Sequence, residues 1–223
     1  MTTTPFELVV LDLAGTTVAD DGLVEAAFAR AWDRVLDTED GRAAALAHVR
    51  ATMGQSKIDV FRALVDERLA QEINVAFEDA FRALIAEGRC EEIPGAHETI
   101  EALRSRGLKI AFTTGFARAT ADAILDSLGW RGLADVVLTP ADAGGRGRPA
   151  PDLALAAMRL TDVSNAAAMV CVGDTESDAR SGRAANAGLV VGVLTGSRSE
   201  AELKDAGAHV VIESVADLPA LLP

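Results

Sequence analysis

The chain has 223 residues, of which 49% are apolar and 25% charged, the balance of a globular protein that forms one large domain or two small ones. Acidic residues outnumber basic ones by 34 to 21, and the resulting net charge of −13 argues against nucleic-acid phosphates and anionic membranes as partners. The longest apolar stretches, such as residues 166–172, are too short to span a bilayer, and residues 1–5 carry neither a basic region nor an apolar signal core.

Six short apolar segments have the composition of buried β-strands. They cover residues 6–13, 108–113, 135–138, 167–172, 189–193 and 209–212. Helical patterns separate most of them, at residues 96–106, 117–128, 151–160 and 176–185. This alternation predicts a doubly wound, Rossmann-like α/β core, whose parallel sheet is covered by helices on both faces. Ligands bind at the carboxyl ends of such strands, so the residues that follow each strand are the candidates for a site.

Residues 22–89 interrupt the alternation, because they contain helical patterns and no convincing strand. The expected helices cover residues 24–36, 43–51, 58–69 and 76–87, with Phe28, Trp32, Phe61, Leu64, Phe77, Phe81 and Leu84 as their core. We therefore expect a helical cap domain over residues 19–90, inserted into a core domain made of residues 1–18 and 91–223. Linkers near residues 18–22 and 89–94 should let the cap move relative to the core.

Polar residues follow several of the predicted strands. Asp12 stands at the end of the first, where a carboxylate can attack phosphorus or bind a metal. Thr114 offers a hydroxyl, and Arg148 a planar fork, to the oxygens of an anion. Asp174 and Asp178 follow a further strand and can present carboxylates to a hard cation such as Mg²⁺. Taken singly, each also fits a turn, a helix cap or a solvated loop.

In this order, the strand-end residues resemble those of the haloacid dehalogenase superfamily, and the resemblance covers essentially the whole chain. The subgroup that it resembles is phosphonoacetaldehyde hydrolase (phosphonatase), and more closely the phosphonatase-like group. The motifs that carry it are Asp12-Leu13-Ala14-Gly15-Thr16-Thr17, Met53-Gly54-x-x-Lys57, Thr114-Gly115, Gly147-Arg148-Pro149 and Gly173-Asp174-Thr175-x-x-Asp178. The chain differs from phosphonatase at Val60, where that family has histidine, and at Phe116, where it has tyrosine. It has Arg148 where a lysine is usual.

The resemblance implies a Mg²⁺-dependent hydrolase that cleaves the carbon–phosphorus bond of a 2-oxoalkylphosphonate such as phosphonoacetaldehyde. Lys57 would form a Schiff base with the carbonyl, and Asp12 would form an aspartyl phosphate. Thr114 and Arg148 would complete the catalytic set. The implied metal site consists of Asp12, the main-chain carbonyl of Ala14, Asp174 and Asp178, and the implied substrate contacts are Ala14, Gly15, Met53, Gly54 and Gly115. The departures at Val60 and Phe116 leave a larger or different 2-oxoalkylphosphonate open.

The residues themselves support this chemistry at two positions. Breaking a carbon–phosphorus bond leaves a basic carbanion, so it needs an electron sink rather than the acid that most phosphatases carry where this chain has Ala14. Ser56 and Asp59 predict a helix N-cap, which puts Lys57 in the first turn of a cap helix. An amine there has a lowered pKa and can condense with a carbonyl β to phosphorus. A solvated surface lysine is the alternative reading.

Two other functions stay open. One is a phosphate-monoester phosphatase on the same fold, for which Lys57 would be dispensable. The other is a binding module without activity, although retention of Asp12, Thr114, Arg148, Asp174 and Asp178 argues against it.

We expect a small organophosphonate or phosphate as substrate and a cytoplasmic location. We also expect free thiols at Cys90 and Cys171, which lack metal-site spacing. A homodimer is left open.

Overall fold

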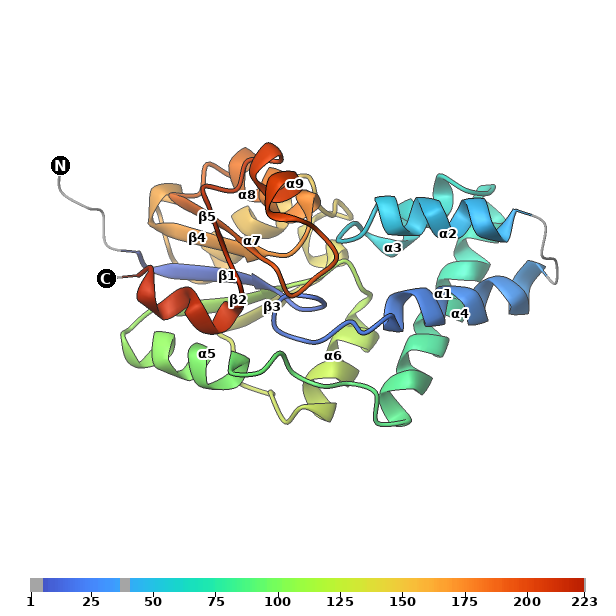
Figure 1. The fold of residues 1–223 in the computed structure, drawn as a ribbon, viewed down its shortest axis with the longest axis horizontal. Coiled ribbons are helices and arrows are strands. Elements are labelled where there is room, and N and C mark those ends of the chain that lie inside the picture. The colour runs from blue at the N-terminus through green and yellow to red at the C-terminus, as the bar shows by residue number, and fades with distance from the viewer. Residues whose placement is uncertain (1–5, 37–40, 223) are drawn as a thin grey trace.

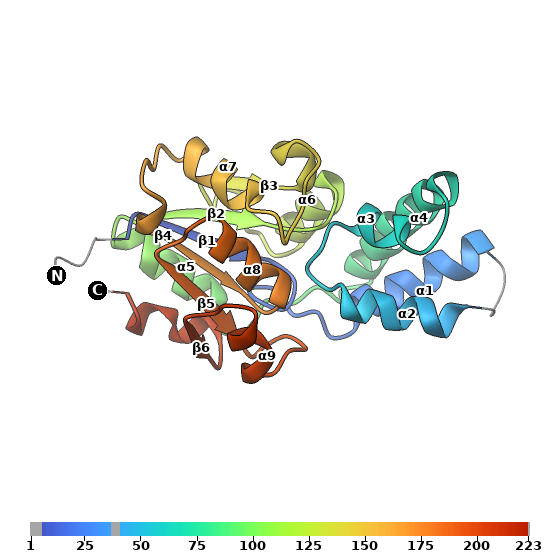
Figure 2. The same ribbon diagram turned by 90° about the horizontal axis from the view of Figure 1, so that it is seen from above.

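Six parallel strands form one sheet in the computed structural model, which describes residues 6–36 and 41–222 (Figures 1 and 2). The strands are β1 (Leu8–Asp12), β2 (Lys109–Thr113), β3 (Val136–Leu138), β4 (Met169–Gly173), β5 (Leu189–Val193) and β6 (Val210–Ile212). Their order across the sheet is β3-β2-β1-β4-β5-β6, with β1 between β2 and β4. The six predicted strands and the doubly wound α/β fold are therefore confirmed.

Helices cover both faces of this sheet. One face carries α5 (Ala96–Ser105), α6 (Arg118–Ser127) and the 3₁₀ helix η3 (Val215–Ala220), and the other carries α7 (Asp152–Leu160), α8 (Glu176–Ala184) and α9 (Glu200–Asp205). The four core helices that the sequence predicts are confirmed. Helix α9, the short η1 (Pro140–Ala143) and η2 (Ala166–Ala168), and η3 were not predicted.

Successive side chains of β1 point to opposite faces of the sheet, and each face packs into its own apolar cluster. Val9 and Leu11 belong to the larger apolar cluster, together with Ile100 of α5. Leu8 and Val10 belong to the second cluster, on the side of α7, α8 and α9. Because both faces of β1 are buried, its register is strongly fixed, and its last residue lies at a defined place on the sheet edge.

Helices α1 (Leu23–Leu36), α2 (Arg42–Ala51), α3 (Lys57–Arg62) and α4 (Glu67–Ala86) pack together beyond the carboxyl ends of the strands (Figures 1 and 2). A row of aromatic rings runs through the group, with centroid distances of 6.4 Å for Phe28–Phe61, 5.6 Å for Phe61–Phe77 and 5.9 Å for Phe77–Phe81. All seven residues expected in this core are buried except Leu64, which is half-buried. The division of the chain into domains at residues 18–19 and 90–91 stays a prediction.

The predicted bounds of the third and fourth helices of this group were wrong. The sequence pattern favoured helices over residues 58–69 and 76–87, whereas α3 ends at Arg62 and α4 already begins at Glu67. Asp66 causes the new start, because its side chain accepts a hydrogen bond from the Leu69 N–H at 3.0 Å and so caps α4. The apolar spacing continues across this cap, and periodicity alone therefore did not reveal it.

Removing the cap should cost a measurable part of the stability. We expect Asp66→Ala to lower the free energy of unfolding by about 1 kcal/mol, because an N–H of the first turn of α4 loses its acceptor. Asp66→Asn keeps a capping oxygen and should stay within a few tenths of a kcal/mol of the wild type. Urea unfolding of the three proteins measures this difference, and equal losses in both variants would contradict the capping role.

Two chain segments connect the sheet to the helical group, and they pair with each other. Val18 and Glu92 form an isolated antiparallel bridge. Its flanking hydrogen bonds run from Ala19 N–H to the Glu91 carbonyl and from Ile93 N–H to the Thr17 carbonyl, both at 2.9 Å. The two predicted linkers therefore lie side by side, as a pair of hinge segments would, although movement of the group stays a prediction.

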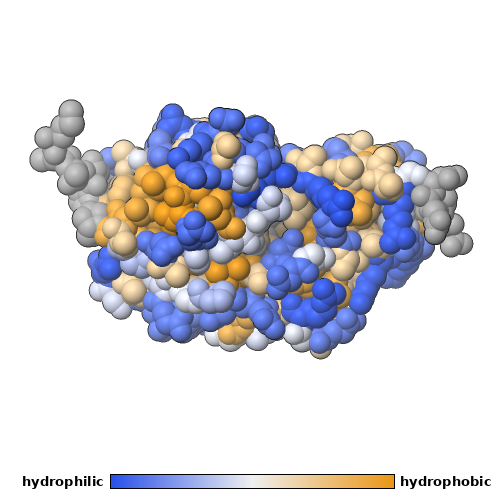
Figure 3. All heavy atoms as spheres, in the orientation of Figure 1, coloured by the Kyte–Doolittle hydropathy of each residue, from blue (hydrophilic) through white to orange (hydrophobic). Residues whose placement is uncertain are grey.

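The exposed edge of the sheet is apolar. Figure 3 shows a hydrophobic patch over the β5–β6 end, and the three residues of β6, Val210, Val211 and Ile212, are half-buried. A strand of only three residues offers little edge for pairing with another chain. Within the described part of the chain, no helix is both long and apolar enough to cross a membrane. Residues 1–5, on which the expectation of a missing export signal rests, lie outside the described residues.

Candidate active site

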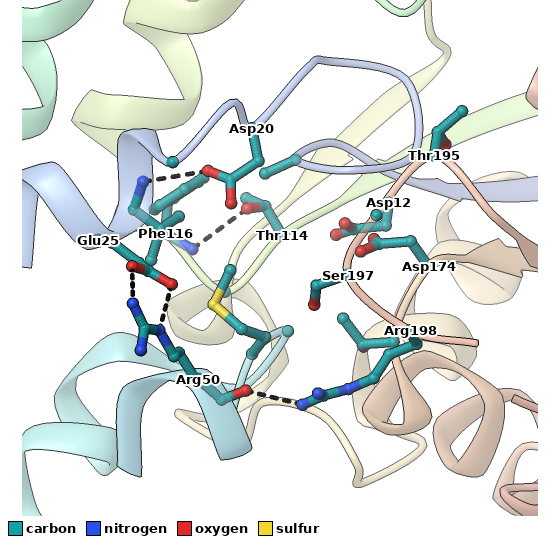
Figure 4. A pocket seen from close by; sticks show the side chains of 18 of the residues that line it. Asp12, Asp20, Glu25, Arg50, Thr114, Phe116, Asp174, Thr195, Ser197 and Arg198 are labelled. Carbon is teal, nitrogen blue, oxygen red and sulfur yellow. Dashed lines mark hydrogen bonds and ion pairs between the residues drawn. The ribbon is translucent and has the colours of Figure 1, made fainter. Parts of the chain in front are cut away.

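A cavity of about 570 Å³ lies between the carboxyl ends of the strands and the helical group (Figure 4). Its lining brings together most of the residues singled out from the sequence, namely Asp12, Ala14, Met53, Gly54, Lys57, Thr114, Gly115, Arg148 and Asp174. Two of the predicted site residues, Gly15 and Asp178, are not part of the lining. They lie directly behind it, against Asp174 and Arg148 respectively.

Three buried carboxylates converge at the deep end of the cavity. Asp12 is the last residue of β1, Asp174 follows β4 directly, and Asp178 lies in the first turn of α8. Because β1 and β4 are neighbours in register, their ends meet at the same sheet edge. One oxygen from each carboxylate lies within 4.8 Å of the other two. Such a set of hard oxygen donors suits a divalent cation of the Mg²⁺ type.

Arg148 binds two members of this carboxylate cluster. Its guanidinium donates to Asp12 Oδ1 at 2.5 Å and also to Asp178 Oδ1, and the side chain is only 4% exposed. Asp178 additionally accepts hydrogen bonds from the hydroxyl and the N–H of Thr175. The arginine thus partly balances the negative charge that the sheet edge concentrates, and it stays within reach of an anion bound beside Asp12.

Asp174 is the most strongly perturbed acid of the cluster. Burial, and then the neighbouring Asp12 carboxylate, raise the pKa of Asp174 above its usual value. The hydroxyl of Thr16 donates to Asp174 Oδ1 at 3.0 Å and acts in the opposite direction. A bound cation would favour the charged form of Asp174, because it adds positive charge beside this buried carboxyl group.

Close backbone approach explains two glycines of the site. A Cβ on Gly15, which has φ +88°, would lie 2.4 Å from Asp174 Oδ2. A Cβ on Gly54, which has φ +81°, would lie 2.3 Å from Oγ1 of Thr175. The loop before α3 therefore touches the turn between β4 and α8, and this contact seats the helical group on the sheet domain.

Substituting Gly54 tests this contact against a matched glycine. Gly88 has the same φ of +81°, but a Cβ there would meet nothing within 4 Å. Both Gly54→Ala and Gly88→Ala carry the penalty of a left-handed alanine. Only the first also creates a clash, so we expect it to lose about 1–3 kcal/mol more in urea unfolding. Equal losses would show that the Gly54–Thr175 approach contributes nothing.

Lys57 is the first residue of α3, as the sequence predicts, and its side chain enters the cavity. It is 7% exposed, with its Nζ 5.3 Å from the centre of the Phe116 ring. Burial lowers the pKa of Lys57 below that of an ordinary lysine, although the nearby carboxylates of Asp20, Asp12 and Glu78 act against that shift. The predicted side-chain cap is absent, since the side chain of Ser56 makes no capping hydrogen bond although it holds the N-cap position.

Apolar side chains occupy the two positions, Val60 and Phe116, at which the sequence departs from the phosphonatase resemblance, and of the two Phe116 lines the cavity. Val60, one turn further along α3, is 3% exposed and belongs to the larger apolar cluster. Phe116 follows Gly115 in the loop after β2 and lies with its ring centroid 4.5 Å from that of Phe81 and 6.3 Å from that of Phe77. This packing connects the β2 loop, which carries Thr114, to helix α4.

Sequence reasoning missed three parts of the cavity wall. They are residues 195–198 in the loop after β5, residues 20–22, 24 and 25 around the start of α1, and Arg50 near the end of α2. The β5 loop follows a strand end, so the rule that located Asp12 and Asp174 applied to it equally well. Its serine, glycine and arginine form no recognisable motif, so the sequence did not predict that this loop lines the site.

Known proteins match the chain over its sheet and its helical group. Residues 6–186 match the family of haloacid dehalogenase-like hydrolases. Phosphonoacetaldehyde hydrolase of Bordetella pertussis is 30% identical over 97% of this chain and 91% of its own length. A bifunctional phosphonoacetaldehyde hydrolase/aminoethylphosphonate transaminase of Clostridioides difficile is 36% identical over 155 residues, which cover 58% of this chain and 24% of that protein. A hydrolase structure from Pseudomonas syringae matches with a TM-score of 0.83 and 25% identity, over 96% of each chain.

Proposed function

The chain belongs to the haloacid dehalogenase-like hydrolase family, and from this premise we propose that it hydrolyses the carbon–phosphorus bond of a 2-oxoalkylphosphonate such as phosphonoacetaldehyde. One observation carries the proposal. The buried amine of Lys57 shares a cavity with Asp12, while Ala14 occupies the position from which an acid would assist ester cleavage. The similarity to phosphonoacetaldehyde hydrolases points in the same direction.

Lys57 supplies the electron sink that this bond cleavage needs. Its neutral amine adds to the substrate carbonyl, and loss of water gives an imine, which takes up one proton from the solvent to become an iminium ion two bonds from phosphorus. Burial favours the neutral form of the amine, because it lowers the pKa of Lys57. The nearby carboxylates help to stabilise the positive charge of the iminium once it has formed.

Asp12 then attacks phosphorus with a carboxylate oxygen. As the new oxygen–phosphorus bond forms, the electron pair of the carbon–phosphorus bond moves onto carbon and into the iminium, which becomes an enamine. Water hydrolyses the aspartyl phosphate and returns the Asp12 carboxylate and inorganic phosphate. Protonation of the enamine and hydrolysis of the resulting imine release an aldehyde and free Lys57.

The remaining residues bind and orient the phosphoryl group. Asp12, Asp174 and the main-chain carbonyl of Ala14 would hold Mg²⁺, with Asp178 orienting this set, and the clustering of the three carboxylates fits that assignment. When bound, the cation neutralises charge on the phosphoryl oxygens. Thr114 and Arg148 donate to the other oxygens. Met53, Gly54 and Gly115 form part of the wall around the substrate, and Gly15 lies behind this wall against Asp174.

A phosphate-monoester phosphatase is the second candidate, and the buried apolar side chains of Val60 and Phe116 favour it. These side chains give Lys57 no hydrogen-bonding partner for the proton transfers of imine chemistry. Asp12, Asp174 and Arg148 would serve ester hydrolysis equally well. In both cases the substrate is a small organophosphorus anion; a homodimer and a cytoplasmic location stay predictions.

Two substrates that differ by one atom separate the candidates. Glycolaldehyde phosphate has an ester oxygen between phosphorus and the methylene carbon, whereas in phosphonoacetaldehyde these two atoms are bonded directly. We expect phosphate release from the phosphonate to exceed release from the ester at least about a hundredfold in kcat/KM, because the general acid that would assist the ester is missing at Ala14. Both activities should vanish when EDTA removes the metal. Faster release from the ester would favour the phosphatase.

A further inference from the structure

The loop after β5 forms the outer wall of the cavity and contributes a cation to it. Thr195 fixes this loop, since its hydroxyl donates to the Gly15 carbonyl at 2.7 Å. Ser197 and Arg198 follow, and Figure 4 shows them between Asp174 and Arg50. The loop thus continues from the carboxylate cluster at the deep end towards the mouth of the cavity.

Arg198 differs from the other cations that line the cavity. Arg148 binds Asp12, and Arg50 binds Glu25 through two hydrogen bonds of 2.6 and 2.7 Å. Lys57 interacts with acids that line the cavity, and among them Asp20 has the strongest electrostatic effect on it. The carboxylate nearest to Arg198 is that of Glu176, which is not part of the cavity lining.

Only some of the N–H groups of the Arg198 guanidinium form hydrogen bonds with the described residues. Its Nη2 donates to the main-chain carbonyl of Arg50 at 2.7 Å, which fixes its position against α2. Its Nε lies 3.5 Å from Glu176 Oε2, yet it is buried and has no hydrogen-bond partner among the described residues. Glu176 is also shared with Arg180, at 3.9 Å. The buried Nε lies on the side of Glu176, outside the cavity lining, so only the rest of the Arg198 side chain, which lines the cavity, is open to a ligand.

The size of the cavity indicates how far a ligand extends. Its volume of about 570 Å³ falls within the ~300–1,000 Å³ range of sites that hold ligands of drug size. A two-carbon phosphonate bound at Asp12 fills only a fraction of that space. Met53, Ser197 and Arg198 are also part of the cavity lining, in addition to the residues around Asp12.

We propose that Arg198, assisted by the hydroxyl of Ser197, binds a carboxylate at the end of the substrate remote from phosphorus. The inference rests on the proposed function, because the same cavity binds the phosphonate. The substrate class is accordingly a 2-oxoalkylphosphonate that ends in a carboxylate. A planar guanidinium matches that group with two parallel hydrogen bonds, and the distal anion adds binding energy that a short aldehyde lacks. The products are inorganic phosphate and the corresponding methyl-ketone acid.

Matched substrates test this subsite by kinetics. The carboxylate 4-oxo-5-phosphonopentanoate and the uncharged 2-oxopentylphosphonate have chains of equal length. We expect the Mg²⁺-loaded enzyme to prefer the carboxylate about tenfold or more in kcat/KM, as one charge-assisted hydrogen bond provides. Arg198→Gln should reduce the preference to about one, and Arg198→Lys should keep part of it. Arg180→Gln, which removes the other partner of Glu176 outside the cavity, should leave the preference unchanged.

A binding measurement separates failure of the subsite from failure of the proposed function. The pair 5-phosphonopentanoate and pentylphosphonate lacks the carbonyl, so its binding, measured by calorimetry, needs no chemistry at Lys57. A preference for the carboxylate that depends on Arg198, without cleavage of any phosphonate, would support the subsite and overturn the carbon–phosphorus function. Cleavage of phosphonates without any Arg198-dependent preference would overturn the subsite alone. The second result would also follow if Arg198 only ties the β5 loop to α2.

Discussion

Replacing Asp12 with asparagine should abolish phosphate release while the protein stays folded. Asparagine has nearly the same shape as aspartate but cannot form an acyl phosphate, so we expect kcat to fall by at least about 10⁴-fold, as for other catalytic nucleophiles. Initial rates of phosphate release from phosphonoacetaldehyde measure the loss. The same variant also loses one of the three carboxylates that would hold the cation.

A neighbouring acid provides the control for this substitution. Asp21 also lines the cavity, but it is exposed and does not belong to the carboxylate cluster. Asp21→Asn should keep at least about half of the activity, since surface substitutions away from special features have small effects. Unfolding curves of both variants should show an intact cooperative transition. Turnover by Asp12→Asn close to that of the wild type would overturn the assignment of the nucleophile.

Lys57→Arg should lose cleavage of the carbon–phosphorus bond almost completely. Arginine keeps the positive charge near Asp12, but its guanidinium cannot form an imine at neutral pH, because it stays protonated. We expect kcat to fall at least about 10³-fold on phosphonoacetaldehyde, since no other electron sink is provided. Lys204→Arg, at an exposed lysine of α9 that pairs with Glu200, serves as the control and should behave like the wild type.

The same variant distinguishes covalent from electrostatic action of the lysine. If Lys57 acted only through its charge, arginine would rescue much of the rate. Hydrolysis of glycolaldehyde phosphate, which needs no imine, should be affected far less than cleavage of the phosphonate. An active Lys57→Arg enzyme would exclude the imine mechanism, and the phosphatase candidate would then account for the site.

The sheet and the deep end of the site were predictable from sequence for a physical reason. The strands β1 and β4, which carry the acids, are short apolar runs buried on both faces, and such runs end where the chain turns at the sheet edge. Asp12 and Asp174 could therefore be recognised as site residues both because they are acids and because they stand at strand ends. Helix bounds inside the helical group were less predictable, because the cap at Asp66 interrupts an apolar spacing that continues on both sides of it.

Two contacts between segments far apart in the chain could not be predicted from the sequence. The donation from Arg198 to the Arg50 carbonyl joins residues 148 positions apart. The approach of Gly54 to Thr175 likewise depends on how the helical group sits on the sheet domain. Neither residue pair forms a sequence motif, so only the folded chain reveals them, and they define the outer half of the cavity.

Reductive trapping tests the central claim, imine chemistry at Lys57, most directly. The Mg²⁺-loaded enzyme is incubated with phosphonoacetaldehyde and borohydride, digested, and analysed by peptide mass spectrometry. The account predicts an irreversible modification on Lys57, an ethyl group if trapping follows bond cleavage or a phosphonoethyl group if it precedes it, together with loss of activity. Continued phosphate release from the phosphonate, with Lys57 unmodified, would contradict it.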